Sequence, residues 1–246
     1  MLRGEIAALT AAFLWALSTV LFGRLGKSIS PLVLNLAKGS IAIALITLTL
    51  LLRANLYPEL SRVAVFWLLL SGAIGIGLGD TAYFKAINSL GARRALLMES
   101  LAPPLTALIA WLFLGEMLSE IACLGIFLTI AGVAWVIAER VPVSEGISQQ
   151  PWPGIFWGLL AALGQASGAV MSRGALADTV VDPLWSGLLR IVAGVAVLVI
   201  LVSLRGRVIA QLRPLRSGQL LTVVVLAAFL GTYLGVWLQQ VSFKYT

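Results

Sequence analysis

The chain has 246 residues, of which 60% are hydrophobic and only 11% are charged. A soluble domain carries roughly a quarter charged residues, so this composition indicates an integral membrane protein. The net charge of +7 does not indicate nucleic-acid binding, because the basic residues fall mainly at the ends of apolar stretches. The sequence has no histidine, one cysteine and no metal-ligand spacing, nucleophile motif or phosphate loop, so no enzyme activity, metal or cofactor is expected.

Apolar stretches follow one another along the whole chain. A helix that crosses a bilayer needs about 20 apolar residues. Residues 1–25 are predicted to be an uncleaved first span rather than a signal peptide, because no cleavage motif follows them. Eight spans are predicted, at 5–25, 31–53, 63–87, 93–114, 118–138, 153–174, 183–204 and 217–240.

An internal repeat runs through these spans. Aligning Gly4 with Gly154 brings five further identical residues of the first and sixth spans together. The second and seventh spans both begin with Pro-Leu and carry a basic residue seven positions later, and the third and eighth share a G-x-x-L-G pattern. Three matches in the same order predict a repeat of five helices. The matched residues are Pro31 with Pro183, Lys38 with Arg190, and Gly75 with Gly231.

A unit with an odd number of helices places its second copy in the membrane in the opposite orientation. Inverted repeats with a site near the bilayer midplane are typical of secondary transporters. We predict a first repeat at 1–138, a linker at 139–152 and an incomplete second repeat at 153–246. The predicted fold class is all-α integral membrane, with eight transmembrane helices of an expected ten. Either the sequence is part of a longer chain, or the protein itself is short.

Several segments resemble the EamA-type family of the drug/metabolite transporter (DMT) superfamily. The resemblance implies a fold of ten helices in two inverted five-helix repeats, and movement of a small metabolite across the membrane. It also implies that the fourth and fifth helices of the second repeat would form one wall of a central cavity. The residues that carry the resemblance are Trp15, the pair Pro31 and Lys38, the segment LAPPLTALIAWLFLGE at 101–116, and Gly125 and Gly132.

Three ionisable residues are predicted to share one depth in the membrane. Asp80 and Glu99 lie roughly 12–16 Å from the turn between the third and fourth spans, and Lys38 lies roughly 10 Å inside the second. Because an ionisable group in hydrocarbon is costly, they should face each other or water. Three interpretations are open for these residues. They bind substrate or couple a proton, they form a neutral pair that only orients helices, or their side chains extend to the membrane–water interface. Arg190 is expected toward the opposite face, and the counterpart of Asp80 is Val236.

Other candidate residues are aromatic, amide, proline and glycine positions. Pro103 and Pro104 should kink the fourth span and free backbone carbonyls, as a hinge or as a structural bend. Paired glycines should let helices pack closely, and their places suggest gates. Further candidates for the substrate or ion pathway are Trp15, Tyr83, Gln165, Tyr233 and Trp237, each of which could instead be a packing or interface residue; the paired glycines are Gly75, Gly79, Gly231 and Gly235.

Three functions remain open at this point. The first is a secondary transporter that moves an amino acid or drug-like compound by alternating access. The second is a non-transporting membrane subunit or an inactive truncated fragment, and the third is a nucleotide-sugar or lipid-linked sugar carrier. Expected partners are a small-molecule substrate, a coupling proton or other ion, the lipid of the cell membrane, and a second copy in a homodimer. The charge distribution and the family resemblance favour opposite orientations, so orientation stays open.

Overall fold

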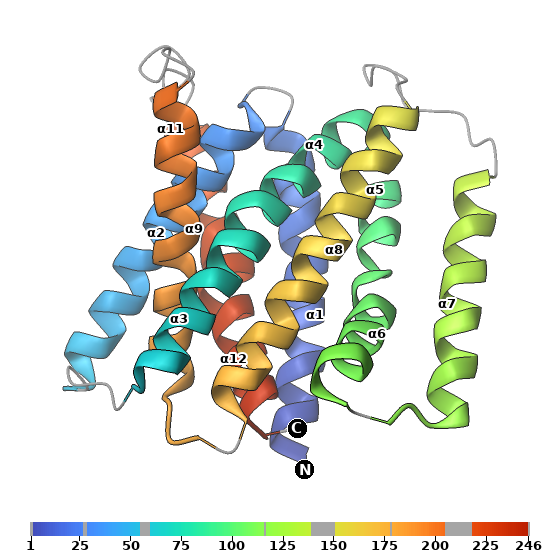
Figure 1. The fold of residues 1–246 in the computed structure, drawn as a ribbon. Coiled ribbons are helices and arrows are strands. Elements are labelled where there is room, and N and C mark those ends of the chain that lie inside the picture. Colours follow the sequence, from blue (N-terminus) through green and yellow to red (C-terminus); the bar gives the residue numbers. More distant parts are fainter. Residues whose placement is uncertain are drawn as a thin grey trace.

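The computed structural model describes residues 2–26, 29–54, 60–115, 117–138, 151–177, 179–204 and 218–245. Figure 1 shows that these residues form a bundle of long helices, without strands among them. Five stretches are single helices: α1 (Leu2–Leu25), α2 (Pro31–Leu52), α7 (Glu120–Ala138), α8 (Pro151–Leu176) and α9 (Pro183–Leu204). Three are composite: α3 (Arg62–Ser71) with η1 (Gly72–Gly79) and α4 (Asp80–Leu90); α5 (Ala92–Glu99) with α6 (Ala102–Leu114); and α11 (Gly218–Ala227) with η3 (Ala228–Leu234) and α12 (Gly235–Tyr245).

The all-α membrane fold class is confirmed. Seven stretches of the described residues are long and apolar enough to cross a bilayer. The predicted span 118–138 forms α7, whose apolar part, Glu120–Val136, is shorter than the other seven. Of the predicted linker 139–152, residues 139–150 lie outside the described residues. Residues 151 and 152 belong to α8.

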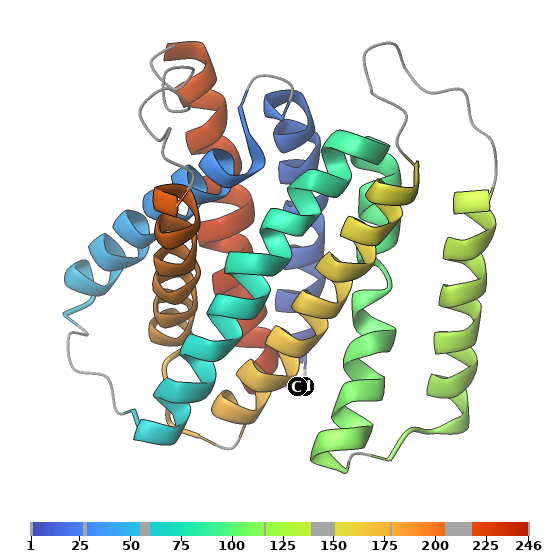
Figure 2. The same cartoon turned by 45° about the horizontal axis from the view of Figure 1, so that its top comes forward.

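Apolar side chains also cover the outside of the bundle. Phe113 of α6 and Trp135 of α7 are 79% and 77% exposed. In both Figure 1 and Figure 2, α7 stands at one edge of the bundle, beside the α5–α6 stretch. Large apolar side chains can face outward here because lipid tails are as apolar as the side chains themselves.

Helix lengths repeat between the two parts of the chain. α2 and α9 both have 22 residues and begin at a proline. α3 and α11 both have 10 residues, and each leads through a π-helical segment into an 11-residue helix. In Figure 1, α1 rises from the lower edge, where the N-terminus lies, whereas α8 descends from the upper edge. These features agree with the inverted repeat, which stays a prediction together with its boundaries.

The π-helical segment η1 is anchored by a side chain of α2. The backbone N–H of Asp80 donates to the carbonyl of Gly75, five residues earlier. In an α-helix it would donate to the carbonyl of Ile76. The Asn35 side-chain amide donates to that Ile76 carbonyl at 2.9 Å. The wide turn therefore has a partner for the acceptor that it frees, and it ends directly at Asp80.

The second π-helical segment, η3, is anchored in the same way by α1. The N–H of Gly235 reaches back to Leu230, five residues earlier, and the Trp15 indole N–H donates to the Gly231 carbonyl at 2.8 Å. A Cβ added at Gly235 would lie 2.5 Å from Trp15 Nε1, and one at Gly231 would lie 2.3 Å from the Ser18 hydroxyl. Both glycines therefore let α1 approach η3 closely.

Paired glycines bring η1 into contact with α8. A Cβ added at Gly164 would lie 3.0 Å from the Cα of Gly79, and one at Gly168 would lie 3.3 Å from the Cα of Gly75. Both pairs of glycines therefore lie where the backbones of η1 and α8 approach closely, as small residues in membrane helices allow. η1 of the first part packs against α8 of the second, and η3 of the second part packs against α1 of the first. Each part therefore contacts the other through its π-helical segment.

We expect Gly72→Ala to destabilise the fold. A Cβ at this position would lie 2.0 Å from the backbone oxygen of Arg190, which cannot move without shifting α9. Overpacking of this kind costs about 1–3 kcal/mol or more. Gly125→Ala is the matched control, because a Cβ there meets nothing within 4 Å. Thermal unfolding in detergent measures both, and equal midpoints for the two variants would contradict the close crossing of η1 and α9.

Candidate functional site

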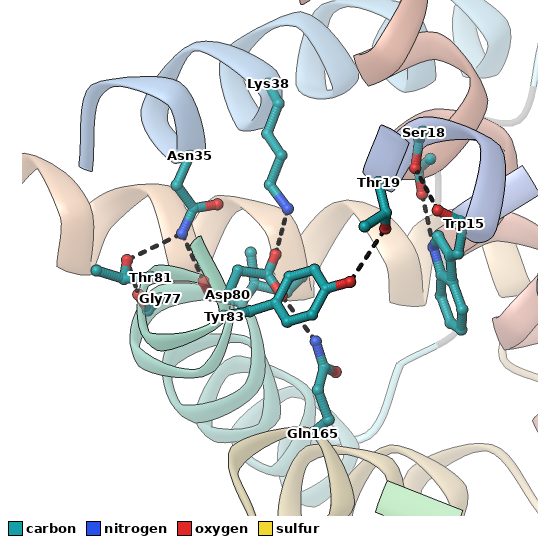
Figure 3. Close-up of polar contacts among 12 residues, drawn as sticks. Trp15, Ser18, Thr19, Asn35, Lys38, Gly77, Asp80, Thr81, Tyr83 and Gln165 are labelled. Carbon is teal, nitrogen blue, oxygen red and sulfur yellow. Dashed lines mark hydrogen bonds and ion pairs between the residues drawn. The ribbon is translucent and has the colours of Figure 1, made fainter. Parts of the chain in front are cut away.

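A buried ion pair lies where α2 meets the start of α4. Lys38 binds one carboxylate oxygen of Asp80, and the two side chains are only 9% and 12% exposed (Figure 3). The other carboxylate oxygen accepts a hydrogen bond of 2.7 Å from the Gln165 side chain on α8. Asp80 is therefore neutralised by one helix and bound by another, as an acid within apolar helices requires.

Aromatic rings and short polar side chains surround this pair. The Lys38 ammonium lies 5.0 Å from the ring centroid of Phe84 and 5.8 Å from that of Phe22. The Tyr83 hydroxyl is hydrogen-bonded to the Thr19 hydroxyl on α1 at 3.1 Å (Figure 3). Cation–π contacts of this kind are attractive and fix the lysine head group among α1, α2 and α4.

Glu99 belongs to the same group of charges. It is the last residue of α5 and interacts electrostatically with Asp80 and Lys38, and Tyr83 interacts with both acids. One carboxylate oxygen of Glu99, Oε2, is buried and has no hydrogen-bond partner. The structure thus places Lys38, Asp80, Glu99 and Tyr83 near one another, with Gln165 in direct contact with Asp80.

The fourth predicted span is interrupted just before its prolines. α5 ends at Glu99, Ser100 and Leu101 form a turn, and Pro103 and Pro104 stand in the first turn of α6. The interruption lies where the two prolines remove N–H donors from the preceding turn. The predicted role of the prolines as a hinge stays a prediction.

Arg190 does not contact the ion pair directly. It belongs to α9, and its guanidinium group lies between η1 and α8. It is 1% exposed, and Nη1 donates to the Gln239 side chain at 3.3 Å while Nε has no partner. Gly75 and Gly168 flank the guanidinium group. Its charge interacts with that of Asp80 without a hydrogen bond between them among the described contacts.

Two aromatic candidates lie elsewhere in the bundle. The Tyr233 hydroxyl is hydrogen-bonded to the Thr49 hydroxyl at 2.8 Å. The Arg53 guanidinium carbon lies 5.0 Å from the ring centroid of Trp237. Thr49 lies eleven residues after Lys38 on α2, which is about 16 Å along a helix. These two side chains therefore do not contact the Lys38–Asp80 pair. Trp15 is likewise engaged with η3.

Some residues near the pair were not predicted from the sequence. Asn35 binds both the Ile76 carbonyl and the Thr81 hydroxyl, and Thr19 and Phe22 approach from α1. Asn35 had a detectable signal, since it is an amide in an apolar helix three residues before Lys38. A buried amide, Gln240, also went unpredicted; it accepts hydrogen bonds from Ser172 and Ser186.

A bundle of membrane-spanning helices that buries a lysine, an aspartate and an arginine defines a multi-pass membrane protein with a charged interior. The model of the EamA-like transporter family matches residues 2–138, more than half of the chain, and the chain belongs to this family. It is 31% identical over 140 residues to uncharacterized protein PA1977 of Pseudomonas aeruginosa. That match covers 57% of this chain and 47% of the relative, so the chain spans about half of the relative's length.

The fold also resembles a solved structure, described only as "Crystal structure of protein". The TM-score is 0.72 at 18% sequence identity, and the match covers 98% of this chain and 79% of that one. This likeness shows that the helices are arranged as in a known fold.

Proposed function

We propose that the protein is a secondary transporter that moves a small organic metabolite, an amino acid or drug-like compound, across the cell membrane by alternating access. The observation that carries the proposal is the position of Asp80. It is bound by Lys38 from the first predicted repeat and by Gln165 from the second. Because the two parts of the bundle share this carboxylate, the binding of a substrate at Asp80 can change the position of one part relative to the other.

Alternating access requires one repeat to move against the other around a fixed site. The Gln165 hydrogen bond must break in such a movement, whereas the Lys38–Asp80 pair lies within the first repeat and can persist. Glycines on both sides, Gly75 and Gly79 of η1 and Gly164 and Gly168 of α8, lie in the contact between these helices and present no side chains that would block a movement. A substrate with a polar head group can then compete for Asp80 or Gln165 when the contact opens.

Uptake into proteoliposomes tests the proposal. Purified protein is reconstituted, and a panel of radiolabelled amino acids and organic amines is offered with and without a pH or sodium gradient. We expect uptake of at least one member above that of protein-free liposomes, and its loss when the gradient is collapsed. A folded protein that moves none of the panel in either direction would favour a non-transporting membrane subunit.

Gln165→Leu should slow transport without unfolding the protein. The variant removes the hydrogen bond from α8 to the Asp80 carboxylate, and hydrogen bonds to charged groups contribute about 1.5–3 kcal/mol. We expect the initial uptake rate to fall about tenfold or more, since 1.4 kcal/mol corresponds to a factor of ten. Gln219→Leu, at an exposed position of α11, is the control. Equal initial uptake rates for the two variants would remove Gln165 from the mechanism.

A further inference from the structure

We propose that the break between α5 and α6 binds a small monovalent cation, held by the Glu99 carboxylate and the main-chain carbonyl oxygens of Glu99 and Ser100. The cation is either an inorganic ion or the ammonium group of the transported metabolite, which share a single positive charge and a preference for oxygen ligands. The inference rests on the proposed transport function and assigns the cation to a residue other than Asp80.

The first observation is the unpaired carboxylate oxygen. Glu99 Oε2 is buried and has no hydrogen-bond partner. Lys38 does not neutralise it by contact, because its ammonium group binds Asp80, which also accepts from Gln165. A buried carboxylate oxygen without a partner is unfavourable, and a bound cation removes that cost.

The second observation concerns two main-chain carbonyls at the break, those of Glu99 itself and of Ser100, which lose their helical donors. The carbonyls of Glu99 and Ser100 would accept from the N–H groups of residues 103 and 104 in a continuous helix, but both are prolines and have none. The turn uses other acceptors: the Ser100 N–H donates to Leu96 and Leu97, and the Leu101 N–H to Met98. No backbone donor to the Ser100 carbonyl is found among the described residues, and the Glu99 carbonyl lacks the donor that a residue other than proline at position 103 would supply.

The charge and ligands of the break match a monovalent cation. α5 ends at Glu99, so the negative end of its helix dipole adds to the carboxylate. Unwound carbonyls and the C-terminal ends of broken helices are oxygen ligands suited to sodium or protonated groups. The described part of the chain holds no group of three or more metal-ligating side chains, so one carboxylate and neutral carbonyls must suffice. That set balances one positive charge and is poor for a divalent ion.

The break is also reachable. Glu99 as a whole is half-buried and Ser100 is exposed, so the turn is not sealed inside the bundle. Tyr83 interacts electrostatically with Glu99, so the turn belongs to the same group of polar residues as the ion pair.

Thermal unfolding of the purified full chain tests the site without transport. Sodium, potassium and methylammonium chlorides are titrated against choline chloride at constant pH and ionic strength. We expect sodium or methylammonium to raise the unfolding temperature saturably, because a ligand that binds only the folded state stabilises it. A response to sodium identifies an inorganic ion, and one to methylammonium identifies the substrate's ammonium group.

Two sets of variants assign the effect to the break. Glu99→Gln should weaken the apparent affinity at least tenfold, whereas Glu120→Gln, an exposed acid at the start of α7, should leave it unchanged. Pro103→Ala and Pro104→Ala restore N–H donors to the carbonyls without changing any charge, and should weaken binding several-fold. No cation effect, the same effect in Glu99→Gln, or a dependence on pH alone overturns the inference.

The outcomes separate this inference from the proposed function. Uptake by the wild-type chain together with no cation effect would overturn the cation site and leave transport intact. Specific cation binding without uptake of any compound would leave the cation site intact and overturn the transport function.

Discussion

Transport is expected to be lost, with the fold retained, when Lys38→Met and Asp80→Leu are combined. Either single change leaves a buried charge without its partner and should lower stability by about 3–5 kcal/mol. Replacing both by apolar residues removes that penalty, and in other proteins such exchanges are neutral or stabilising. The double variant should therefore unfold near the wild-type temperature and still show no uptake above protein-free liposomes.

This experiment separates the two interpretations of the ion pair. If the pair only orients helices, the double variant keeps transport, because the apolar residues pack α2 against α4 equally well. Thermal unfolding and initial uptake rate are measured on the same preparations. Arg24→Met, at an exposed position near the end of α1, is the control for the loss of a basic residue.

Arg190→Met should leave the protein equally stable or more stable while reducing transport at least tenfold. Wild-type Arg190 is 1% exposed, and among the described residues it donates one hydrogen bond, of 3.3 Å, to Gln239 and leaves Nε unpaired. Methionine fills similar space without a buried charge, which should raise stability by about 1–3 kcal/mol. Transport should fall because Arg190 is the second cation whose charge acts on Asp80.

Arg190→Lys keeps the positive charge and tests the guanidinium group itself. The lysine cannot reproduce the planar set of donors between the glycines, so we expect partial transport. Wild-type uptake in Arg190→Met would make this arginine a packing residue alone. Unfolding temperature and uptake together distinguish the two results, since only a functional role predicts that they change in opposite directions.

Helix positions and the grouping of charges could be predicted because both follow from local rules. Apolar length sets each span, and the rise per residue places Lys38 and Asp80 at similar distances from their turns. Their contact then needs only the condition that buried charges pair. The helix break near Glu99 was partly predictable, because proline marks it, but the side on which the helix stops depends on the turn geometry.

Contacts between the two parts of the chain could not be predicted in this way. Gln165 lies 85 residues from Asp80, and hydrophobic periodicity does not say which helix faces which. The π-helical segments were also missed, since a glycine-rich stretch has the same apolar pattern whether its hydrogen bonds span four or five residues. Tyr233 and Trp237 were candidates for the pathway, but their aromatic character alone does not tell at which depth they lie.

The η1 segment also predicts how this helix aligns with those of related sequences. A π-helical turn accommodates about one residue more than the α-helical turn that it replaces, while the faces of α3 and α4 on either side stay in phase. If the same residues closed into a regular α-helix, Asp80 would rotate by about 100° about the helix axis, away from Lys38. A related sequence with a regular helix here should therefore align with a single-residue gap within the glycine run. Such gaps, found at η1 or at η3, would show which half of the chain gained its extra residue first.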